Sequence, residues 1–394
     1  MSLIGDGLFP VALTFGVLDL THSGTDVGLV LAAFAVPMVL FTLVGGVWAD
    51  RLRREWVMIA SDLFRFLTLA VIAGLLFTHH ARVWNLALLG FAYGCGDAFF
   101  YPAYTALIQQ IVPRDRLQEA NALRGVSEGF GWFVGPSISG ILIAFIGTSG
   151  TLAVDAATFL VSAAFLLALR VPALVRSQGR TTTFLTELRD GWREVCSRTW
   201  LWVMMLHAML VLFVTIAPLQ VLGPLAITTR HQSPALWGFM VGLFSLGMLV
   251  GGLVALYYRP LRPMVTVTLC STTAAMAMLA LALRLSPGAL VTVWFLRGIA
   301  IGVLTAIWEA SLQHHIPHES MARVSSWDWM TGGGLWPVGL VIAGPIAQTI
   351  GLTNALWLSG GCGVACSLWV LFVKDVWRLR GPAAPATATD SSPT

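Results

Sequence analysis

The amino-acid sequence predicts an all-α membrane protein with twelve transmembrane helices in two six-helix, pseudo-symmetric halves. The chain of 394 residues is 57% hydrophobic and 11% charged, whereas a soluble domain would carry about twice that charged fraction. Its apolar runs reach roughly 20 residues, the length of a membrane-spanning helix, and they lack the alternation of β-barrel strands. Arginines gather in loops on one predicted side, which is typical of cytoplasmic loops.

The first half contains six apolar segments, separated by short polar turns. We predict membrane helices over residues 1–20, 27–49, 56–77, 84–108, 120–145 and 152–169. No basic stretch precedes the apolar start, so no cleavable signal peptide is expected. The first segment reads as the latter part of a membrane helix, which leaves two explanations open: a truncated helix, or a start codon placed too late.

A polar interval, 171–199, separates this N-terminal bundle (1–170) from the second half. Apolar residues at helical spacing within it predict an amphipathic helix at the inner membrane surface. The C-terminal bundle (200–375) should hold helices over 200–222, 236–258, 264–285, 289–312, 326–350 and 354–373. The Pro/Ala/Ser/Thr-rich tail, 376–394, is expected to be disordered, with both termini in the cytoplasm.

The two halves resemble each other in sequence. The stretch beginning at Gln109 aligns with the stretch beginning at Gln313, a shift of 204 residues. Without a gap, this shift also pairs Trp132 with Trp336, Gly135 with Gly339, Gly140 with Gly344 and Gly147 with Gly351. Such a six-plus-six parallel repeat is a transporter architecture in which the substrate lies between the halves at mid-membrane.

The turn after the second helix carries one Asp and three Arg within five residues, which places it at the cytoplasmic surface. Its pattern resembles the loop between helices 2 and 3 of the major facilitator superfamily, although Arg53 stands where that family usually has Gly. The resemblance implies a major facilitator fold and a gating role for this loop. The implied gating residues are Gly46, Asp50, Arg51 and Arg54, with Asp62 and Arg65 as their structural partners.

A glycine pattern marks the fifth helix: Gly131, Gly135, Pro136 and Gly140. Glycines allow close helix packing, and the proline removes a backbone hydrogen bond, so this face should be flat and bendable. The pattern resembles the helix 5 signature of the antiporter branch, with its final glycine pair reduced to one. A packing helix without directional meaning is the alternative.

Several further stretches resemble the enterobactin-exporter and macrolide-efflux branch of that superfamily. They are Gly5-Asp6-Gly7, Ser61-Asp62-Leu63, Pro102-Ala103-Tyr104, Val112-Pro113 and Ala120-Asn121-Ala122. The resemblance implies a proton-driven exporter of hydrophobic small molecules, such as drugs, macrolides or siderophores. It also implies a monomer in the bacterial plasma membrane, with substrate, protons and lipid as its partners.

Charged residues within membrane spans are costly and therefore mark functional candidates. Four carboxylates are candidates for proton coupling: Asp6, Asp97, Glu128 and Glu309. A carboxylate desolvated in the cavity can exchange a proton near the working pH. The alternatives are a solvated position for Asp6, a bond to a neighbouring helix for Asp97, and neutralisation of Glu128 by Arg124.

Three other features complete the site predictions. Drug antiporters often carry an Arg in helix 4, but Gly90 occupies that place, so an Arg–carboxylate pair within helix 4 is not expected. Arg297 is a weaker intramembrane candidate, and Asp328 should cap the start of helix 11. Tyr104 and Trp308 match across the repeat and are predicted to line the cavity.

Other function classes lack support in the sequence. It shows no phosphate-binding loop and no hydrolase motif, so neither ATP-driven transport nor an enzyme is predicted. The His314, His315 and His318 cluster is read as a solvated loop, and no metal or cofactor is expected. A net charge of +4 does not indicate nucleic-acid binding. Uptake remains an alternative to export, as does a non-transporting receptor or assembly protein with a truncated first helix.

Overall fold

The computed structural model describes residues 2–51, 53–113, 116–169 and 184–379, and at some positions within these ranges only the backbone. Every regular element in the described chain is helical, as predicted. Within these described residues, nine stretches are long and apolar enough to cross a membrane, and one of them, 123–168, contains a chain reversal and therefore covers two crossings.

The N-terminal half consists of helices joined by turns of a few residues. Their bounds are α1 (Ser2–Thr21), α2 (Gly24–Arg51), α3 (Arg54–Phe77), α4 (Val83–Ile111) and α5 (Leu117–Ala168). The long α5 is a hairpin that reverses at Gly147, where φ is 73° and ψ is 176°. Both arms of α5 pack against α1. Ser139 of the first arm donates to the Leu8 carbonyl, and Thr158 of the second arm lies against Gly5.

The C-terminal half repeats this plan, and local interruptions divide its membrane helices. Its elements are α7 (Thr199–Val211), the π-helix η2 (Leu212–Ile216), α8 (Ala217–Thr228), α9 (Pro234–Tyr257), α10 (Pro263–Ala282), α11 (Pro287–His315), α12 (His318–Gly334), α13 (Trp336–Ile350), α14 (Leu352–Leu368), the 3-10 helix η3 (Trp369–Phe372) and α15 (Lys374–Arg378). The helix predicted to start at residue 326 begins at His318, directly after Pro317, and a break at Leu335 divides it into α12 and α13.

The sequence repeat is visible in the backbone. Helices α4 and α11 both have 29 residues, and a shift of 204 superimposes their bounds. Gly351, the partner of Gly147, also has a positive φ, 86°, where the chain passes from α13 to α14. A positive φ is open to glycine at little cost, so the matched glycines mark matched chain reversals.

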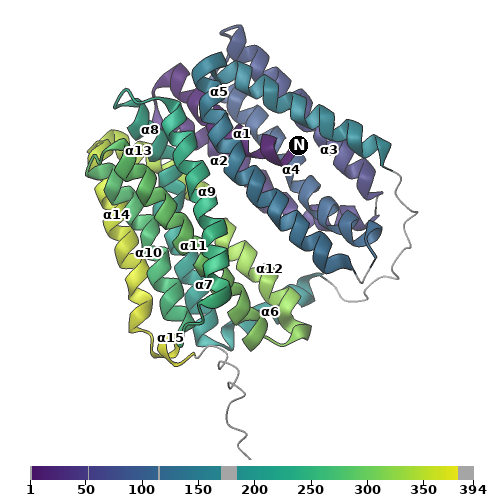
Figure 1. Ribbon diagram of the computed structural model, residues 1–394, viewed down its shortest axis with the longest axis vertical. Coiled ribbons are helices and arrows are strands. Elements are labelled where there is room, and N and C mark those ends of the chain that lie inside the picture. Colours follow the sequence, from purple (N-terminus) through teal and green to yellow (C-terminus); the bar gives the residue numbers. More distant parts are fainter. Residues whose placement is uncertain (1, 52, 114–115, 170–183, 380–394) are drawn as a thin grey trace, which may run out of the picture.

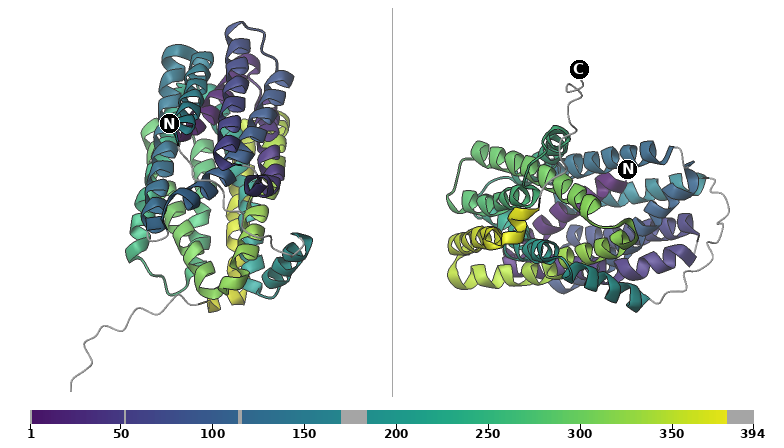
Figure 2. Two further views of the ribbon diagram at one scale, coloured as in Figure 1. Left: turned by 90° about the vertical axis from the view of Figure 1, so that its right-hand side faces the viewer. Right: turned by 90° about the horizontal axis from the view of Figure 1, so that it is seen from below.

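The two halves lie side by side (Figures 1 and 2) and contact each other through two equivalent helix pairs: α5 with α9, and α2 with α13. A Cβ added to Gly140 of α5 would lie only 2.9 Å from the Ala235 Cα, and Gly344 of α13 lies directly against the backbone of Thr25. Both glycines lie near the end of the molecule that carries the Gly147 and Gly351 reversals, here called the Gly147 end. The halves are therefore in backbone contact at the Gly147 end.

The opposite end, here called the linker end, carries the predicted amphipathic helix. This helix, α6 (Phe184–Cys196), packs on α12, and the rings of Trp192 and Trp327 lie 4.6 Å apart. Helical structure continues through α15 into the start of the expected tail, and residues 380–394 lie outside the described chain.

Candidate functional site

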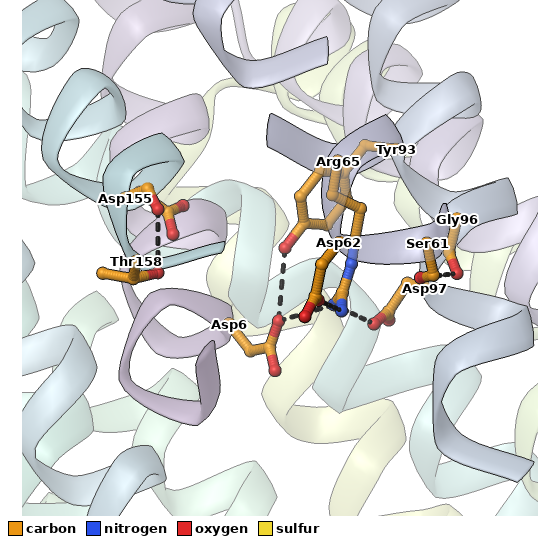
Figure 3. Close-up of polar contacts among 9 residues, drawn as sticks. All are labelled: Asp6, Ser61, Asp62, Arg65, Tyr93, Gly96, Asp97, Asp155 and Thr158. Carbon is orange, nitrogen blue, oxygen red and sulfur yellow. Dashed lines mark hydrogen bonds and ion pairs between the residues drawn. The ribbon is translucent and has the colours of Figure 1, made fainter. Parts of the chain in front are cut away.

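A single guanidinium, that of Arg65 in α3, joins three helices of the N-terminal half. Arg65 Nη1 donates to Asp6 Oδ1 of α1 and to Asp97 Oδ1 of α4, both at 3.0 Å. Arg65 Nη2 donates to Asp62 Oδ1 at 2.7 Å, one turn earlier on α3. Figure 3 shows the three carboxylates converging on Arg65, and we call these four residues the Arg65 cluster.

Aromatic rings enclose the Arg65 cluster. The Arg65 guanidinium lies 4.4 Å from the ring centre of Phe100 and 4.3 Å from that of Phe159, which are cation–π distances. The Tyr93 hydroxyl lies 3.4 Å from Asp6 Oδ1. These rings exclude water from Arg65, whose side chain is fully buried, whereas Asp6 and Asp97 keep 22% and 19% of their side chains exposed.

Small residues create the space for this cluster. A Cβ on Gly96 of α4 would lie 2.9 Å from the Arg65 Cγ, so a glycine is needed beside Asp97 for α3 to approach α4. The Ser61 hydroxyl donates to the Gly96 carbonyl at 2.7 Å and joins the same two helices. Local sequence thus positions Arg65: Asp62 shares its helix face, and Gly96 opens the facing helix.

The predicted helix 5 motif packs on the residues that flank Asp6. A Cβ on Gly7 would lie 2.9 Å from both the Gly135 Cα and the Pro136 Cδ. The other end of the motif reaches the second half, because a Cβ on Gly140 would lie 3.1 Å from the Gly238 Cα of α9. The motif therefore lies between the helix that carries Asp6 and the interface of the two halves.

A fourth carboxylate, Asp155 in the second arm of α5, was not predicted. It is fully buried, and neither of its carboxylate oxygens has a hydrogen-bond partner among the described side chains. Figure 3 shows Asp155 beside Thr158, on the far side of Asp6 from Arg65. Its signal in the sequence was an acidic residue within a predicted span, the same signal that identified Asp6 and Asp97.

Charge in the Arg65 cluster is unbalanced. When ionised, its three carboxylates carry three negative charges against the single positive charge of Arg65. Uncompensated charge is costly in a low-dielectric interior, and a buried acid relieves that cost by binding a proton. The chemistry of the Arg65 cluster is therefore compatible with proton binding.

The structure places the other predicted residues as follows. Asp62 and Arg65, expected as partners of the gating loop, bond each other, and Arg65 also bonds Asp6 and Asp97. The structure describes only the backbone at Gly46, Asp50, Arg51 and Glu128, so the roles of these residues stay predictions. Arg54 is partly buried and donates to Gln110 Oε1 at 3.4 Å, while Glu309 is exposed on α11. Tyr104 is half-buried and stacks on Phe100.

A cavity of about 500 Å³ lies within the C-terminal half, between α7, η2, α8, α9, α10, α11 and α12. Trp308 lines it, and its Nε1 donates to Asp328 Oδ2 at 3.0 Å. Asp328 was predicted to cap a helix, but the earlier start of α12 puts it inside that helix. His207, which sequence reasoning missed, also lines the cavity and bonds Ser271 Oγ at 2.9 Å and the Cys366 carbonyl at 3.0 Å.

Known proteins resemble the chain over nearly its whole length. Macrolide efflux protein A of Streptococcus pyogenes is 23% identical over 389 residues, which cover 96% of this chain and 95% of that protein. The multidrug efflux pump Tap of Mycolicibacterium fortuitum is 28% identical over 365 residues, with coverages of 88% and 87%.

Solved structures show the same fold. The crystal structure of the nucleoside transporter NupG matches with a TM-score of 0.72 at 14% identity, covering 94% of this chain and 96% of that one. A bacterial homologue of the iron transporter ferroportin in an inward-facing state matches with a TM-score of 0.72 at 15% identity, covering 95% and 96%. The family model described as Major Facilitator Superfamily matches residues 1–337. The chain therefore belongs to the Major Facilitator Superfamily of membrane transporters.

Proposed function

We propose that the chain is a proton-coupled exporter of hydrophobic small molecules, with Asp6 and Asp97 of the Arg65 cluster as its proton carriers. The observation that carries this proposal is the convergence of three carboxylates on one buried guanidinium. Asp6 and Asp97 are partly exposed and can meet water, whereas Asp62 is fully buried. We assign proton exchange to Asp6 and Asp97 and a fixed structural charge to Asp62.

Protonation would act through helix packing. A proton on Asp6 weakens its bond to Arg65 and frees α1 from α3. Because Gly7 packs on Gly135 and Pro136, a shift of α1 would displace α5, which in turn contacts α9 in the other half. A switch at the Arg65 cluster can thus bias the rocking of the halves that alternating access requires.

Orientation and direction complete the proposal. The arginine-rich loops support an orientation in which the linker end and both termini lie in the cytoplasm of a bacterial cell and the Gly147 end lies outside. Backbone contact at the Gly147 end corresponds to a carrier closed toward the outside. The Asp50 loop would hold the linker end closed when the carrier is open toward the outside. We propose export rather than uptake because two relatives of the chain are named as efflux proteins. The proposed carrier works as a monomer.

The test measures proton release from acid-loaded inverted membrane vesicles on addition of macrolides, lipophilic drugs or siderophores. Wild type should release protons with at least one compound, and Asp6→Asn should abolish the release. Asp19→Asn is the matched control, because Asp19 lies on the same helix but is exposed, and it should behave as wild type.

Each other outcome changes the proposal. Release that persists in Asp6→Asn but is lost in Asp97→Asn would move the proton to α4. Release that survives both changes would remove the Arg65 cluster from coupling. If correctly folded protein gives no release with any compound, export is wrong, and substrate accumulation in right-side-out vesicles would separate uptake from a non-transporting receptor.

A further inference from the structure

One buried cation in the C-terminal half has no charge partner in the described structure. Arg297 of α11 is 7% exposed and forms no hydrogen bond or ion pair with a described residue. Its guanidinium lies 4.5 Å from the ring centre of Phe244, and its Nε is buried without a partner. A buried charge is expected to be paired, so this arrangement requires an explanation.

The internal repeat shows what Arg297 lacks. The shift of 204 residues that superimposes α4 on α11 pairs Tyr93 with Arg297 and Asp97 with Ile301. The same shift pairs Asp155 with Ser359. Arg297 therefore occupies the place that Tyr93 holds beside the Arg65 cluster, but the neighbouring acids of the N-terminal half are absent from its surroundings.

Among the side chains that the structure describes, no other helix of the C-terminal half supplies a buried balancing acid. Helices α7, α8, α10 and α14 contain no Asp or Glu. On α11, Glu309 is exposed. Asp328 lines the cavity, but it accepts the hydrogen bond of Trp308. Among the described side chains, the N-terminal half thus has buried carboxylates in excess, and the C-terminal half has a buried cation without an anion.

Arg297 faces space that a ligand can fill. It lines the 500 Å³ cavity described above, whose walls are mainly apolar and include Trp237, Phe244 and Trp294. A cavity of this size and composition can hold a small lipophilic molecule, and a single charged group in its wall can orient that molecule. The π-helix η2 contributes Leu212 and Ile216 to the wall, and π-helical turns recur at functional sites.

We propose that Arg297 binds an oxyanion on the transported compound, so that the substrate class is a lipophilic organic anion. A planar guanidinium can hold a carboxylate, sulfonate or phosphate through two parallel hydrogen bonds, while the aromatic wall takes the apolar body. This inference rests on the proposed function, because it assumes a carrier of small molecules.

The test uses three probes with one aromatic body and different charge: 1-naphthylacetate, neutral 1-naphthylacetamide and cationic 2-(1-naphthyl)ethylammonium. Isothermal titration calorimetry of the purified protein in phosphatidylcholine nanodiscs gives a Kd for each. Wild type should bind the acetate about ten- to a hundredfold more tightly than the amide, since hydrogen bonds to charged groups are the stronger ones. Binding of the cation should be weakest.

Arg297→Gln should bind acetate and amide equally and keep the wild-type affinity for the amide within about threefold, because the apolar wall is unchanged. Arg297→Lys should retain part of the preference for the acetate. Arg262→Gln is the matched control: its guanidinium also lies over a ring, that of Trp377 at 5.1 Å, but it does not line the cavity. It should keep the full preference.

Several results would overturn the proposal: tighter binding of the cation, no binding of any probe by wild type, or a preference that survives in Arg297→Gln. An anionic lipid presents the same chemistry, so the titration is repeated in nanodiscs that contain phosphatidylglycerol. If the acetate no longer binds in those nanodiscs, Arg297 binds the lipid headgroup, and the proposal that it binds a transported anion is wrong. Proton release from vesicles is a separate measurement, so failure of export can be distinguished from failure of anion binding.

Discussion

The Arg65 guanidinium lies 3.0 Å from the Asp6 carboxylate, although 59 residues separate them in the sequence. This bond ties α3 to α1 inside one half of the transporter. It also makes Arg65 the shared partner of Asp62 and Asp97, so the stability of the N-terminal half depends on this side chain.

Arg65→Gln should destabilise the protein strongly. The change leaves three carboxylates in a buried site without a cation, and breaking a buried ion pair typically costs about 3–5 kcal/mol. Thermal unfolding in detergent should show a markedly lower Tm. Arg65→Gln combined with Asp62→Asn should recover part of the loss, and a double variant no more stable than the single one would contradict the charge argument.

Asp155→Asn should preserve or raise stability. Both Asp155 carboxylate oxygens are buried without a described partner, so removing its charge should cost less than about 1 kcal/mol. Asp62→Asn is the comparison, because it removes the negative charge from a fully buried 2.7 Å ion pair with Arg65 and should lower the Tm. A large drop in Tm for Asp155→Asn would show that this carboxylate has an essential ionic partner.

Gly96→Ala should disturb the Arg65 cluster more than its single added methyl group suggests. That methyl group would lie 2.9 Å from the Arg65 Cγ, so α3 and α4 must separate or Arg65 must shift. Overpacking of this kind typically costs about 1–3 kcal/mol. Substrate-induced proton release should fall with stability. Gly74→Ala, where a Cβ meets nothing within 4 Å, is the control, and it should match wild type.

Gly140→Val should favour separation of the halves at the Gly147 end. Its side chain would meet the backbone of Ala235 and Gly238 in the other half. Cysteine accessibility at Ala235, measured with a membrane-impermeant maleimide on Ala235→Cys, should rise several-fold in Gly140→Val. The matched change Gly125→Val, on the same helix but facing open space, should leave the labelling rate unchanged.

The architecture was largely predictable from the sequence because hydropathy, arginine-rich turns and the internal repeat are local or periodic signals. The pairing of Gly147 with Gly351, made from sequence alone, coincides with two positive-φ reversals. Helix interruptions were less predictable: η2 has no proline or glycine within its bounds, and Pro218, which follows it, marks an irregularity in the helix but does not specify a π-helix.

The site was only partly predictable. Asp6 and Asp97 were recognised because acids are rare within membrane spans. Their shared partner was not, since the expected arginine was sought on helix 4, where Gly90 stands, and the structure supplies Arg65 from α3. Sequence spacing shows which residues share a helix face, but the rotation of that face toward a neighbouring helix depends on packing across the whole half.

The contact of the first arm of α5 with both α1 and α9 has a thermodynamic consequence. One stretch of α5 touches α1 through Gly135 and α9 through Gly140. In the proposed mechanism, proton binding and closure of the Gly147 end would therefore be linked equilibria. If protonation shifts the free energy of opening that end by a given amount, opening shifts the free energy of proton binding by the same amount. A substitution such as Gly140→Val, remote from every carboxylate of the Arg65 cluster, should therefore alter the pH at which the carrier is half-protonated.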